Sequence, residues 1–302
     1  MLVSLVIHHA KNRKLEIYVI ASDLPDTDRQ KIEASLCENR SDFELTSLHW
    51  LSPNMDMFQD LHVSRYITLS SYLRLLAPSV LPEDFDRVLY LDSDMVILSD
   101  LSALYDSLFN DNAILAARDF HIGIVSAPDG VFNYAELGIP AENHYFNAGV
   151  LLINLRRWRE EKIADCILRY LNLHKASVHF YDQGGMNAIL HNSWTEIDPA
   201  WNQTRGILFP EIWKKLGYST AEWKRAKNHP RIVHFDGPAK PWLPGIRWPD
   251  YSHFFTYLDR TAYRNAFRGP RLERLVGRKV YFFLWRAVQK FRVFLKRLKR
   301  GV

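Results

Sequence analysis

A short apolar run that ends directly in two carboxylates constrains this chain more than any other feature. Residues Arg87 to Leu91 (RVLYL) are followed at once by Asp92-Ser93-Asp94. A run that is apolar almost throughout is typical of a central strand covered on both faces. Ligands bind at the carboxyl ends of such strands, and two carboxylates there are costly to desolvate unless a cation compensates them. The segment therefore predicts a buried strand that brings Asp92 and Asp94 to a site for a hard divalent ion.

Short β-branched or aromatic runs alternate with helical patterns along the rest of the chain. Strands are predicted at Leu15 to Ala21, Phe43 to Leu48 and Val150 to Asn154, and helices from about Thr27, around Ser70 to Ala77, from Arg156 to about His174, and after Asp182. This alternation predicts an α/β fold with a mostly parallel central sheet. The stretch from Trp194 to Lys240 is rich in Trp, Pro and Gly, which favours short elements in an acceptor-binding or lid region.

The Asp-x-Asp triplet occurs three times, so the sequence around each copy has to indicate which one binds a cation. The other two are Asp26-Thr27-Asp28 and Asp84-Phe85-Asp86. The first begins a predicted helix, where carboxylates cap the helix, and the second lies in a loop before a strand. Both have a sufficient structural explanation. Only Asp92-Ser93-Asp94 ends a buried strand, and this context favours it as the cation site.

The charge of the chain is unevenly distributed. The formal net charge is +5, but residues 268–302 contain 12 of the 39 basic residues and one acid, so the preceding 267 residues carry a net charge of −6. An acidic body would repel a phosphate polymer, which argues against nucleic acid as a partner. The two cysteines, Cys37 and Cys166, have no metal-ligand or redox spacing, and this fits a reducing cytoplasm.

Three further segments follow the third triplet along the chain. They are Tyr145 to Asn154 (YFNAGVLLIN), Tyr181-Asp182-Gln183 and His234 to Trp242 (HFDGPAKPW). Together with the triplet, they closely resemble the motif set of glycosyltransferase family eight, with the nearest likeness to the bacterial lipopolysaccharide α-galactosyl- and α-glucosyltransferases. The resemblance extends from about Leu2 to Trp242. It implies a GT-A fold, a UDP-hexose donor, Mn²⁺ or Mg²⁺ as cofactor, and retention of anomeric configuration.

The resemblance also implies a set of ligands for the cation. His234 would add an imidazole nitrogen to the carboxylates of Asp92 and Asp94. A mixed nitrogen and oxygen set suits Mn²⁺ better than Ca²⁺. A lone histidine is more often a packed or surface residue, and the Gly-Pro-Ala-Lys run after it favours the metal site here. Ser93 is expected to contribute mostly through its backbone.

Three more residues are expected to contact the phosphates of the donor. Gly237 lets the backbone come close to a phosphate, and Lys240 supplies charge that offsets the departing diphosphate. Arg74 matches the family position that touches donor phosphate or sugar. The alternatives are an ordinary solvated lysine at Lys240 and a helix-surface arginine at Arg74.

The donor hexose is expected to lie against a separate group of polar residues. Asn147, Asp182 and Gln183 match the positions that hold this sugar, and Asp119 matches another sugar-contacting carboxylate. Polar side chains at the edges of apolar segments are what hydroxyl recognition requires. No pair of acids indicates a double displacement, so a front-face mechanism is expected, with Asp182 and Gln183 as the catalytic residues and Gln183 near the anomeric carbon.

The sequence departs from the family pattern at two places. The family begins with a strand that carries an acidic pair for uridine and then a helix, whereas Met1 to Ile7 aligns with that helix. The first strand is therefore expected to be absent, through a misassigned start or a truncation. After Gln183 the family commonly has an acid, but this chain has Gly184-Gly185, so donor or acceptor preference is expected to differ.

The predicted function is transfer of galactose or glucose from a UDP-sugar to a glycan acceptor, such as lipopolysaccharide or a lipid-linked glycan. The alternative is a catalytically impaired homologue that acts as a membrane-associated binding module, motivated by the expected loss of the first strand. The cation ligands and Lys240 favour the enzyme. A metal-dependent phosphohydrolase lacks a water-activating constellation, and no glycine-rich phosphate loop supports a kinase or a dinucleotide oxidoreductase.

The chain is expected to divide into a catalytic domain, 1–267, and a basic amphipathic tail, 268–302. From about Leu272 to Arg300 apolar residues recur at helical spacing, at Val276, Val280, Leu284, Ala287, Val288, Phe291, Phe294, Leu295 and Leu298. Arg278, Lys290 and other basic residues fall largely on another face. This pattern predicts that the tail forms a helix on the inner face of the cell membrane. The alternative is a helix packed against the catalytic domain.

Overall fold

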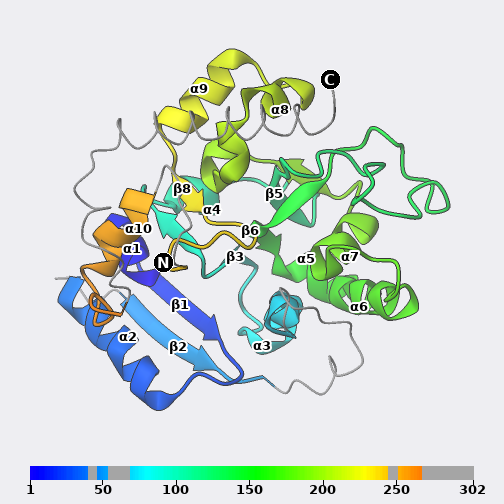
Figure 1. Ribbon diagram of the computed structural model, residues 1–302. Coiled ribbons are helices and arrows are strands. Elements are labelled where there is room, and N and C mark those ends of the chain that lie inside the picture. The colour runs from blue at the N-terminus through cyan, green and yellow to red at the C-terminus, as the bar shows by residue number, and fades with distance from the viewer. Residues whose placement is uncertain (40–45, 54–68, 244–250, 267–302) are drawn as a thin grey trace.

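The computed structural model describes residues 1–39, 46–53, 69–243 and 251–266, with strands at the centre and helices around them (Figure 1). The strands are β1 (Leu15–Ile20), β2 (Thr46–Leu51), β3 (Arg87–Leu91), β4 (Met95–Ile97), β5 (Ile114–Arg118), β6 (Phe146–Asn154), β7 (Trp194–Glu196) and β8 (Ile232–His234). The α-helices are α1 (Leu2–His8), α2 (Asp26–Asn39), α3 (Ala77–Val80), α4 (Ser102–Tyr105), α5 (Leu155–Glu160), α6 (Ile163–Leu173), α7 (Tyr181–Ile189), α8 (Pro210–Lys215), α9 (Thr220–Asn228) and α10 (Tyr251–Leu258). The predicted α/β class is confirmed.

The central sheet contains strands of both directions. Its order is β3-β6-β5-β7, in which β6 pairs antiparallel with β3 and β5, whereas β5 and β7 are parallel. The pair β1 and β2 is also parallel, and no described strand pairs with both β1 and β3. The prediction that the central sheet is mostly parallel is therefore wrong, because two of its three strand pairs among the described residues are antiparallel. Strand β6 is apolar and buried because both its faces are covered, and this pattern does not distinguish parallel from antiparallel pairing.

Alternate residues of the central strands belong to two separate core layers. In β5, Ile114 and Ala116 pack in the layer that includes α5, α6 and α7, while Leu115 and Ala117 pack in the layer that includes α1. This alternation follows from the two-residue period of a strand. Trp158 on α5 is 1% exposed and fills the first layer. Strand β6 is buried along almost its whole length, whereas β3 is only partly buried and lies at the edge of the described sheet, so the prediction of a buried central strand at Arg87 to Leu91 is wrong in these two points. The polar side chains of the site begin at the ends of these two strands.

Strands β4 and β8 form a short antiparallel pair beyond the end of β3. Met95 lies opposite His234 in this pair, and the Phe235 N–H donates to the Asp94 carbonyl at 2.9 Å. Asp94 directly precedes β4, and His234 is the last residue of β8. The pairing therefore brings two of the predicted cation ligands to the same point, although they are far apart in the sequence.

Two predicted helices differ in detail from the structure. The helix expected from Arg156 to about His174 is divided into α5 and α6, because Lys162 has a left-handed backbone with φ of 51°. The helix expected around Ser70 to Ala77 is the 3₁₀ helix η3 (Leu69–Leu76), which continues into α3. Residues Leu2–His8 form α1, as the resemblance implied for the opening segment.

The region from β7 to β8 consists of short elements, as its composition predicted. It includes the 3₁₀ helices η4 (Pro199–Asn202) and η5 (Arg205–Leu208) besides α8 and α9. Trp213 on α8 is 1% exposed and stacks on Phe120 with ring centroids 4.3 Å apart. This stacking anchors the region next to β5, and the Gln203 N–H donates to the Ile232 carbonyl at 2.9 Å. The region thus reaches the site through η4 and β8.

The predicted amphipathic tail, 268–302, lies outside the described residues. Among the helices that the structure does describe, none is both long enough and apolar enough to cross a membrane.

Candidate active site

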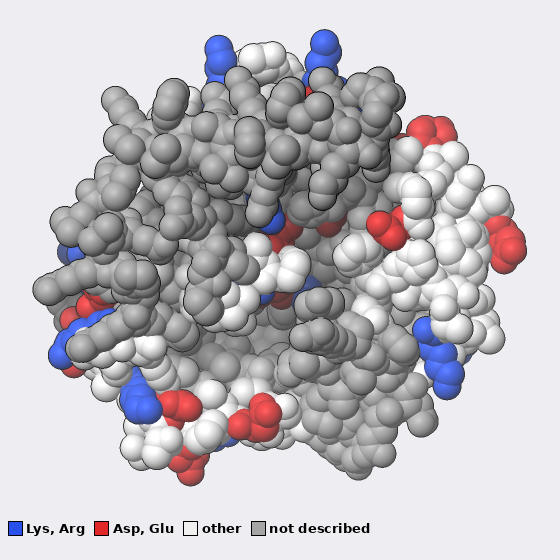
Figure 2. Space-filling model, in the orientation of Figure 1, with Lys and Arg blue, Asp and Glu red and all other residues white. Residues whose placement is uncertain are grey.

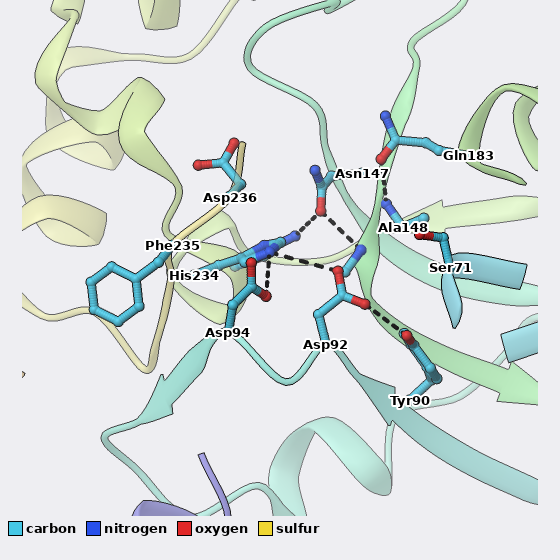
Figure 3. Close-up of polar contacts among 12 residues, drawn as sticks. Ser71, Tyr90, Asp92, Asp94, Asn147, Ala148, Gln183, His234, Phe235 and Asp236 are labelled. Atoms are coloured by element: carbon cyan, nitrogen blue, oxygen red, sulfur yellow. Dashed lines mark hydrogen bonds and ion pairs between the residues drawn. The ribbon is translucent and has the colours of Figure 1, made fainter. Parts of the chain in front are cut away.

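Asp92, Asp94 and His234 lie together at the ends of β3 and β8 (Figure 3). The Asp92 N–H donates to the Gly149 carbonyl on β6 at 2.9 Å, which fixes the first residue beyond β3. His234 Nε2 lies 3.3 Å from Asp94 Oδ1 and 3.7 Å from Asp92 Oδ2. One ligand atom from each of the three residues lies within 4.8 Å of the others. The predicted set of cation ligands is therefore brought together.

Charges of opposite sign compensate one another in this cluster. Burial disfavours the imidazolium of His234, but Asp94 and Asp92 outweigh burial and raise the pKa of His234. Burial likewise disfavours ionised Asp94, but His234 and Lys240 hold the pKa of Asp94 below its ordinary value. The Lys240 ammonium donates to Asp94 Oδ2 and, at 2.8 Å, to the Phe235 carbonyl. Lys240 and His234 thus compensate the negative charge of the carboxylates.

The residues around the cluster fit a divalent cation. A Cβ atom at Gly149 would lie 2.3 Å from His234 Cε1 and 3.0 Å from Asp92 Oδ2. Only glycine at this position lets the two side chains meet against β6. One imidazole nitrogen and two carboxylates are suitable ligands for Mn²⁺, and the carboxylates also suit Mg²⁺. Gly149 was not singled out from the sequence, because its proximity to His234 depends on the pairing of β3 with β6.

Arg74 forms ion pairs with two carboxylates, one in the cation cluster and one outside it. Its Nη2 lies 3.0 Å from Asp92 Oδ1, its Nε lies 2.9 Å from Asp182 Oδ2, and its Nη1 donates to the Ala148 carbonyl. The guanidinium also lies 4.6 Å from the ring centre of Tyr90, whose hydroxyl donates to Asp92 Oδ1 at 2.7 Å. Arg74 is 7% exposed and therefore is not an ordinary surface arginine. It connects a cation ligand with a residue expected to hold the sugar.

Asp182 lies in the first turn of α7 and is 4% exposed. Burial raises the pKa of Asp182 to about 6, although Arg74 opposes this shift. The ion pair with Arg74 lacks hydrogen-bond geometry, and Asp182 Oδ2 has no hydrogen-bond partner among the described residues. The charge of Arg74 therefore compensates this buried oxygen without a hydrogen bond.

Gly184 and Gly185 allow α7 to pack closely against its neighbours. A Cβ atom at Gly185 would lie 2.8 Å from Leu171 Cγ on α6, and one at Gly184 would lie 2.8 Å from Val178 Cγ1. These contacts provide a packing reason for the two glycines that depart from the family pattern. The close approach positions the start of α7, and therefore Asp182 and Gln183, next to β6.

Asn147, Asp119 and Gln183, three of the four predicted sugar-binding residues, form one hydrogen-bonded network. Asp119 Oδ1 accepts the backbone N–H groups of His121 and Ile122 at 2.8 and 2.9 Å. Asp119 Oδ2 accepts from Asn147 Nδ2 and from Gln183 Nε2, each at 3.1 Å. Gln183 Oε1 in turn accepts from the Ala148 N–H at 2.9 Å (Figure 3). The structure thus brings Asn147, Asp119, Asp182 and Gln183 to one side of the cation cluster.

The two remaining predicted residues lie at the outer side of the cluster. Ser93 is exposed between the two aspartates. Gly237 is exposed and has φ of 68°, with no atom within 4 Å of where a Cβ would be. Open space and a left-handed backbone allow a close approach by a ligand. In Figure 2 acidic and basic side chains are visible at the centre of this face, where β3, β6 and β8 lie in Figure 1.

One pair near the site was not predicted from the sequence. His121 Nε2 lies 2.9 Å from Asp236 Oδ2, and this contact raises the pKa of His121. Asp236 Oδ1 accepts the Arg205 N–H at 3.3 Å, so Asp236 links three separate segments. Asp236 lies in the HFDGPAKPW segment, but His121 lies in a loop without any pattern that indicates its partner.

Two carboxylates just beyond the end of β3, with a histidine at the end of β8 in the separate β4-β8 pair, fit a glycosyltransferase of the GT-A type. The chain belongs to Glycosyl transferase family 8, whose family model matches residues 1–244. The catalytic class is therefore a transferase that uses a nucleotide-sugar donor and a glycan acceptor.

Individual relatives agree with this assignment. The chain is 24% identical to General stress protein A of Bacillus subtilis (strain 168) over 277 residues, which cover 91% of this chain and 92% of that protein. It is 25% identical to lipopolysaccharide 1,2-glucosyltransferase of Escherichia coli (strain K12) over 261 residues, or 86% of this chain and 73% of that protein. The structure of galactosyltransferase LgtC in complex with donor and acceptor sugar analogues matches with a TM-score of 0.70 and 21% identity, over 90% of this chain and 95% of LgtC. The LgtC match supports the GT-A fold.

Proposed function

We propose that the protein transfers galactose or glucose from a UDP-sugar to a glycan acceptor, with retention of anomeric configuration and with Mn²⁺ or Mg²⁺ as cofactor. The observation that carries the proposal is the convergence of Asp92, Asp94 and His234 within 4.8 Å, directly beside the buried sugar-binding network. A cation site next to buried hydrogen-bonding groups suits a substrate that has a diphosphate at one end and a hexose at the other.

The cation would be held by Asp92, Asp94 and His234, and when bound it would neutralise charge on the departing diphosphate. Lys240 adds a second positive charge on the same side, since its ammonium already lies against Asp94. Gly237 allows the chain to approach a phosphate closely, because its backbone is left-handed and no atom outside its chain neighbours lies within 4 Å of where a Cβ would be. Arg74 holds Asp92 and Asp182 in place through its two ion pairs.

The hexose would lie against Asn147, Asp119, Asp182 and Gln183. Gln183 Nε2 donates one hydrogen to Asp119 and keeps a second, and Gln183 Oε1 keeps one lone pair after accepting from Ala148. We assign Gln183 to the reacting side of the sugar, where this remaining lone pair stabilises positive charge at the anomeric carbon. Asp182 would accept a sugar hydroxyl at Oδ2, the oxygen that pairs with Arg74 without a hydrogen bond.

The acceptor is proposed to be lipopolysaccharide or a lipid-linked glycan, reached from the inner face of the cell membrane. The name of one relative supports this acceptor, since that protein is a lipopolysaccharide 1,2-glucosyltransferase. The basic composition of residues 268–302 supports binding to an anionic surface.

The full chain, incubated with UDP-glucose, UDP-galactose, GDP-mannose and a CMP-sugar, tests the proposal. We expect release of UDP from one of the two UDP-hexoses, loss of this activity on chelation, and recovery with Mn²⁺ or Mg²⁺. Transfer to a glycan acceptor should give a product with the anomeric configuration of the donor by proton NMR. Preference for the GDP- or CMP-sugar, or undiminished activity after exhaustive chelation, would overturn the proposal.

A further inference from the structure

Asn202 lies directly behind His234, on the side away from the two aspartates. It is the last residue of η4 and is 1% exposed. Its Oδ1 lies 2.9 Å from His234 Nδ1, and its Nδ2 donates to Asn147 Oδ1 at 2.8 Å. Both polar ends of this amide are therefore used, one by the histidine and the other by a residue of the sugar-binding network.

The orientation of the Asn202 amide follows from groups whose hydrogen-bonding roles are unambiguous. Asn147 Oδ1 accepts the backbone N–H of Gly149 at 2.9 Å, so this atom is an oxygen. Asn147 Nδ2 faces the Asp119 carboxylate, which itself accepts two backbone N–H groups. The atom of Asn202 that faces Asn147 Oδ1 must then be the amide nitrogen, which leaves the Asn202 oxygen facing His234.

The tautomer of His234 follows from this orientation. An amide oxygen only accepts, so His234 Nδ1 must carry the hydrogen that it donates to Asn202. The lone pair of the neutral ring then lies on Nε2, the nitrogen that faces Asp94 and Asp92. A histidine binds a metal ion through such a lone pair, and the partner of its other nitrogen sets which nitrogen is available.

The backbone holds Asn202 and His234 in a fixed relation. The Gln203 N–H donates to the Ile232 carbonyl and the His234 N–H donates to the Gln203 carbonyl, each at 2.9 Å. Asp198 caps η4 by accepting the Ala200 N–H at 2.9 Å. Gln203, the residue directly after Asn202, is therefore bonded to β8 through both its N–H and its carbonyl, which restricts the movement of the Asn202 amide relative to the imidazole.

We propose that Asn202 is a positioning residue that fixes the Nδ1–H tautomer and ring orientation of His234 and thereby completes the cation site. The inference rests on the proposed metal site. Through Asn147 and Asp119 the same chain of hydrogen bonds reaches Gln183, so the groups expected to hold the sugar and the cation share one rigid support. Loss of the Asn202 acceptor releases the imidazole of His234 without removing any ligand.

Direct titration of the full chain with Mn²⁺, followed by electron paramagnetic resonance of the free ion, tests this role without turnover. Asn202→Leu keeps the shape but removes both the acceptor for His234 and the donor to Asn147, and we expect Mn²⁺ affinity to fall about 10- to 100-fold. Asn202→Asp loses only the donor to Asn147 and keeps an acceptor for Nδ1–H, so it should recover much of the affinity. Asn133→Leu is the matched control, because Asn133 is also buried and accepts a hydrogen bond, at 2.7 Å, from the Tyr170 hydroxyl away from the site. The Mn²⁺ affinity of this control should change by no more than about twofold. This is much less than the loss expected when the hydrogen-bond partner of a metal ligand is removed.

Nitrogen-15 NMR of the metal-free wild-type protein at alkaline pH provides a second test. The ring nitrogens of His234, assigned by comparison with His234→Gln, should show the Nδ1–H tautomer. The Nε2–H tautomer in the wild type would overturn the inference, as would wild-type Mn²⁺ affinity in Asn202→Leu or an equal loss in Asn202→Asp. If the wild-type protein itself binds no Mn²⁺, the proposed metal site fails, and the tautomer still decides the role of Asn202.

Discussion

Lys240 and Asp94 form an ion pair inside the proposed cation site. The Lys240 ammonium donates to Asp94 Oδ2, and the other oxygen of Asp94 faces His234 Nε2 at 3.3 Å. A divalent cation that binds Asp94 must therefore do so beside a fixed positive charge, which opposes its binding. A diphosphate reverses this relation, because its negative charge attracts both the cation and the lysine. Binding of cation and donor is thus expected to be cooperative.

Replacement of Lys240 by Met should have opposite effects on metal binding and turnover. Removal of one nearby positive charge should strengthen Mn²⁺ binding to the donor-free protein by about 1 kcal/mol, or about fivefold. Turnover should fall about 100-fold, because the departing diphosphate loses a charged partner. Mn²⁺ titration and steady-state kinetics measure the two effects. The exposed Lys214→Met is the control and should change neither, and weaker Mn²⁺ binding in Lys240→Met would contradict the prediction.

Asp94→Asn should abolish activity and leave the fold intact. The amide is a poor ligand for the cation, and a loss of at least about 100-fold in kcat/KM is expected. Urea unfolding should give the wild-type cooperative transition. Asp84→Asn, in an exposed triplet of the same type, should remain fully active. Full activity of Asp94→Asn would exclude this residue as a metal ligand.

Gly149→Ala should weaken Mn²⁺ binding more than tenfold, because the new Cβ would lie 2.3 Å from His234 Cε1 and displace a ligand. Gly138→Ala is a useful comparison, since no atom lies within 4 Å of a Cβ there and φ is +67°. That change should cost about 1–2 kcal/mol of stability from the left-handed backbone and leave metal binding unchanged. Equal Mn²⁺ affinities in the two variants would show that Gly149 does not shape the site.

The stability of the protein should depend on pH through Asp182. Burial raises the pKa of this carboxyl from 3.8 to about 6, so the folded state binds its proton more tightly than the unfolded state. The resulting stabilisation is fully present below about pH 4 and is lost as the pH rises through about 6. Between about pH 4 and pH 7, the free energy of unfolding of the wild type should fall by on the order of 3 kcal/mol relative to that of Asp182→Asn. Urea unfolding of both proteins across this range measures the difference, and a difference that does not vary with pH would contradict the raised pKa.

Deletion of the residues after Arg268 should separate membrane binding from catalysis. The shortened protein should still act on a small soluble acceptor but no longer sediment with anionic liposomes, because basic residues near such a surface contribute about 1 kcal/mol each at best. Neutral liposomes are the control for the full chain. Unchanged sedimentation, or complete unfolding of the shortened protein, would mean that the tail belongs to the core.

Long apolar strands and local motifs were predictable from the sequence, whereas very short strands were not. Strand β3 has the predicted bounds, and β6 extends the predicted Val150 to Asn154 by four residues. Strands β4, β7 and β8 have three residues each, which is too few to show a period of two. Their position depends on backbone pairing with distant segments. The direction of β6 could not be derived either, because burial of both faces gives the same apolar pattern in either direction.

The identities of the site residues were predictable from motifs, but their mutual contacts were not. Asp92, Asp94 and His234 meet as expected. Arg74 was expected to touch the donor, and the structure places it in ion pairs with Asp92 and Asp182. Asn202 has no motif of its own. Its contact with His234 depends on the hydrogen bonds that join η4 to β8, and such long-range pairing is not visible in local sequence.

The antiparallel pair of β4 and β8 also has a consequence for how the protein assembles. Asp94 and His234 become neighbours only when a late segment of the chain closes onto an early one. Contacts between such distant segments form slowly, because the chain must first lose the entropy of a large loop. The cation site is therefore complete only after these two segments have paired. A bound metal ion would join the two segments and stabilise only the chain in which they are paired.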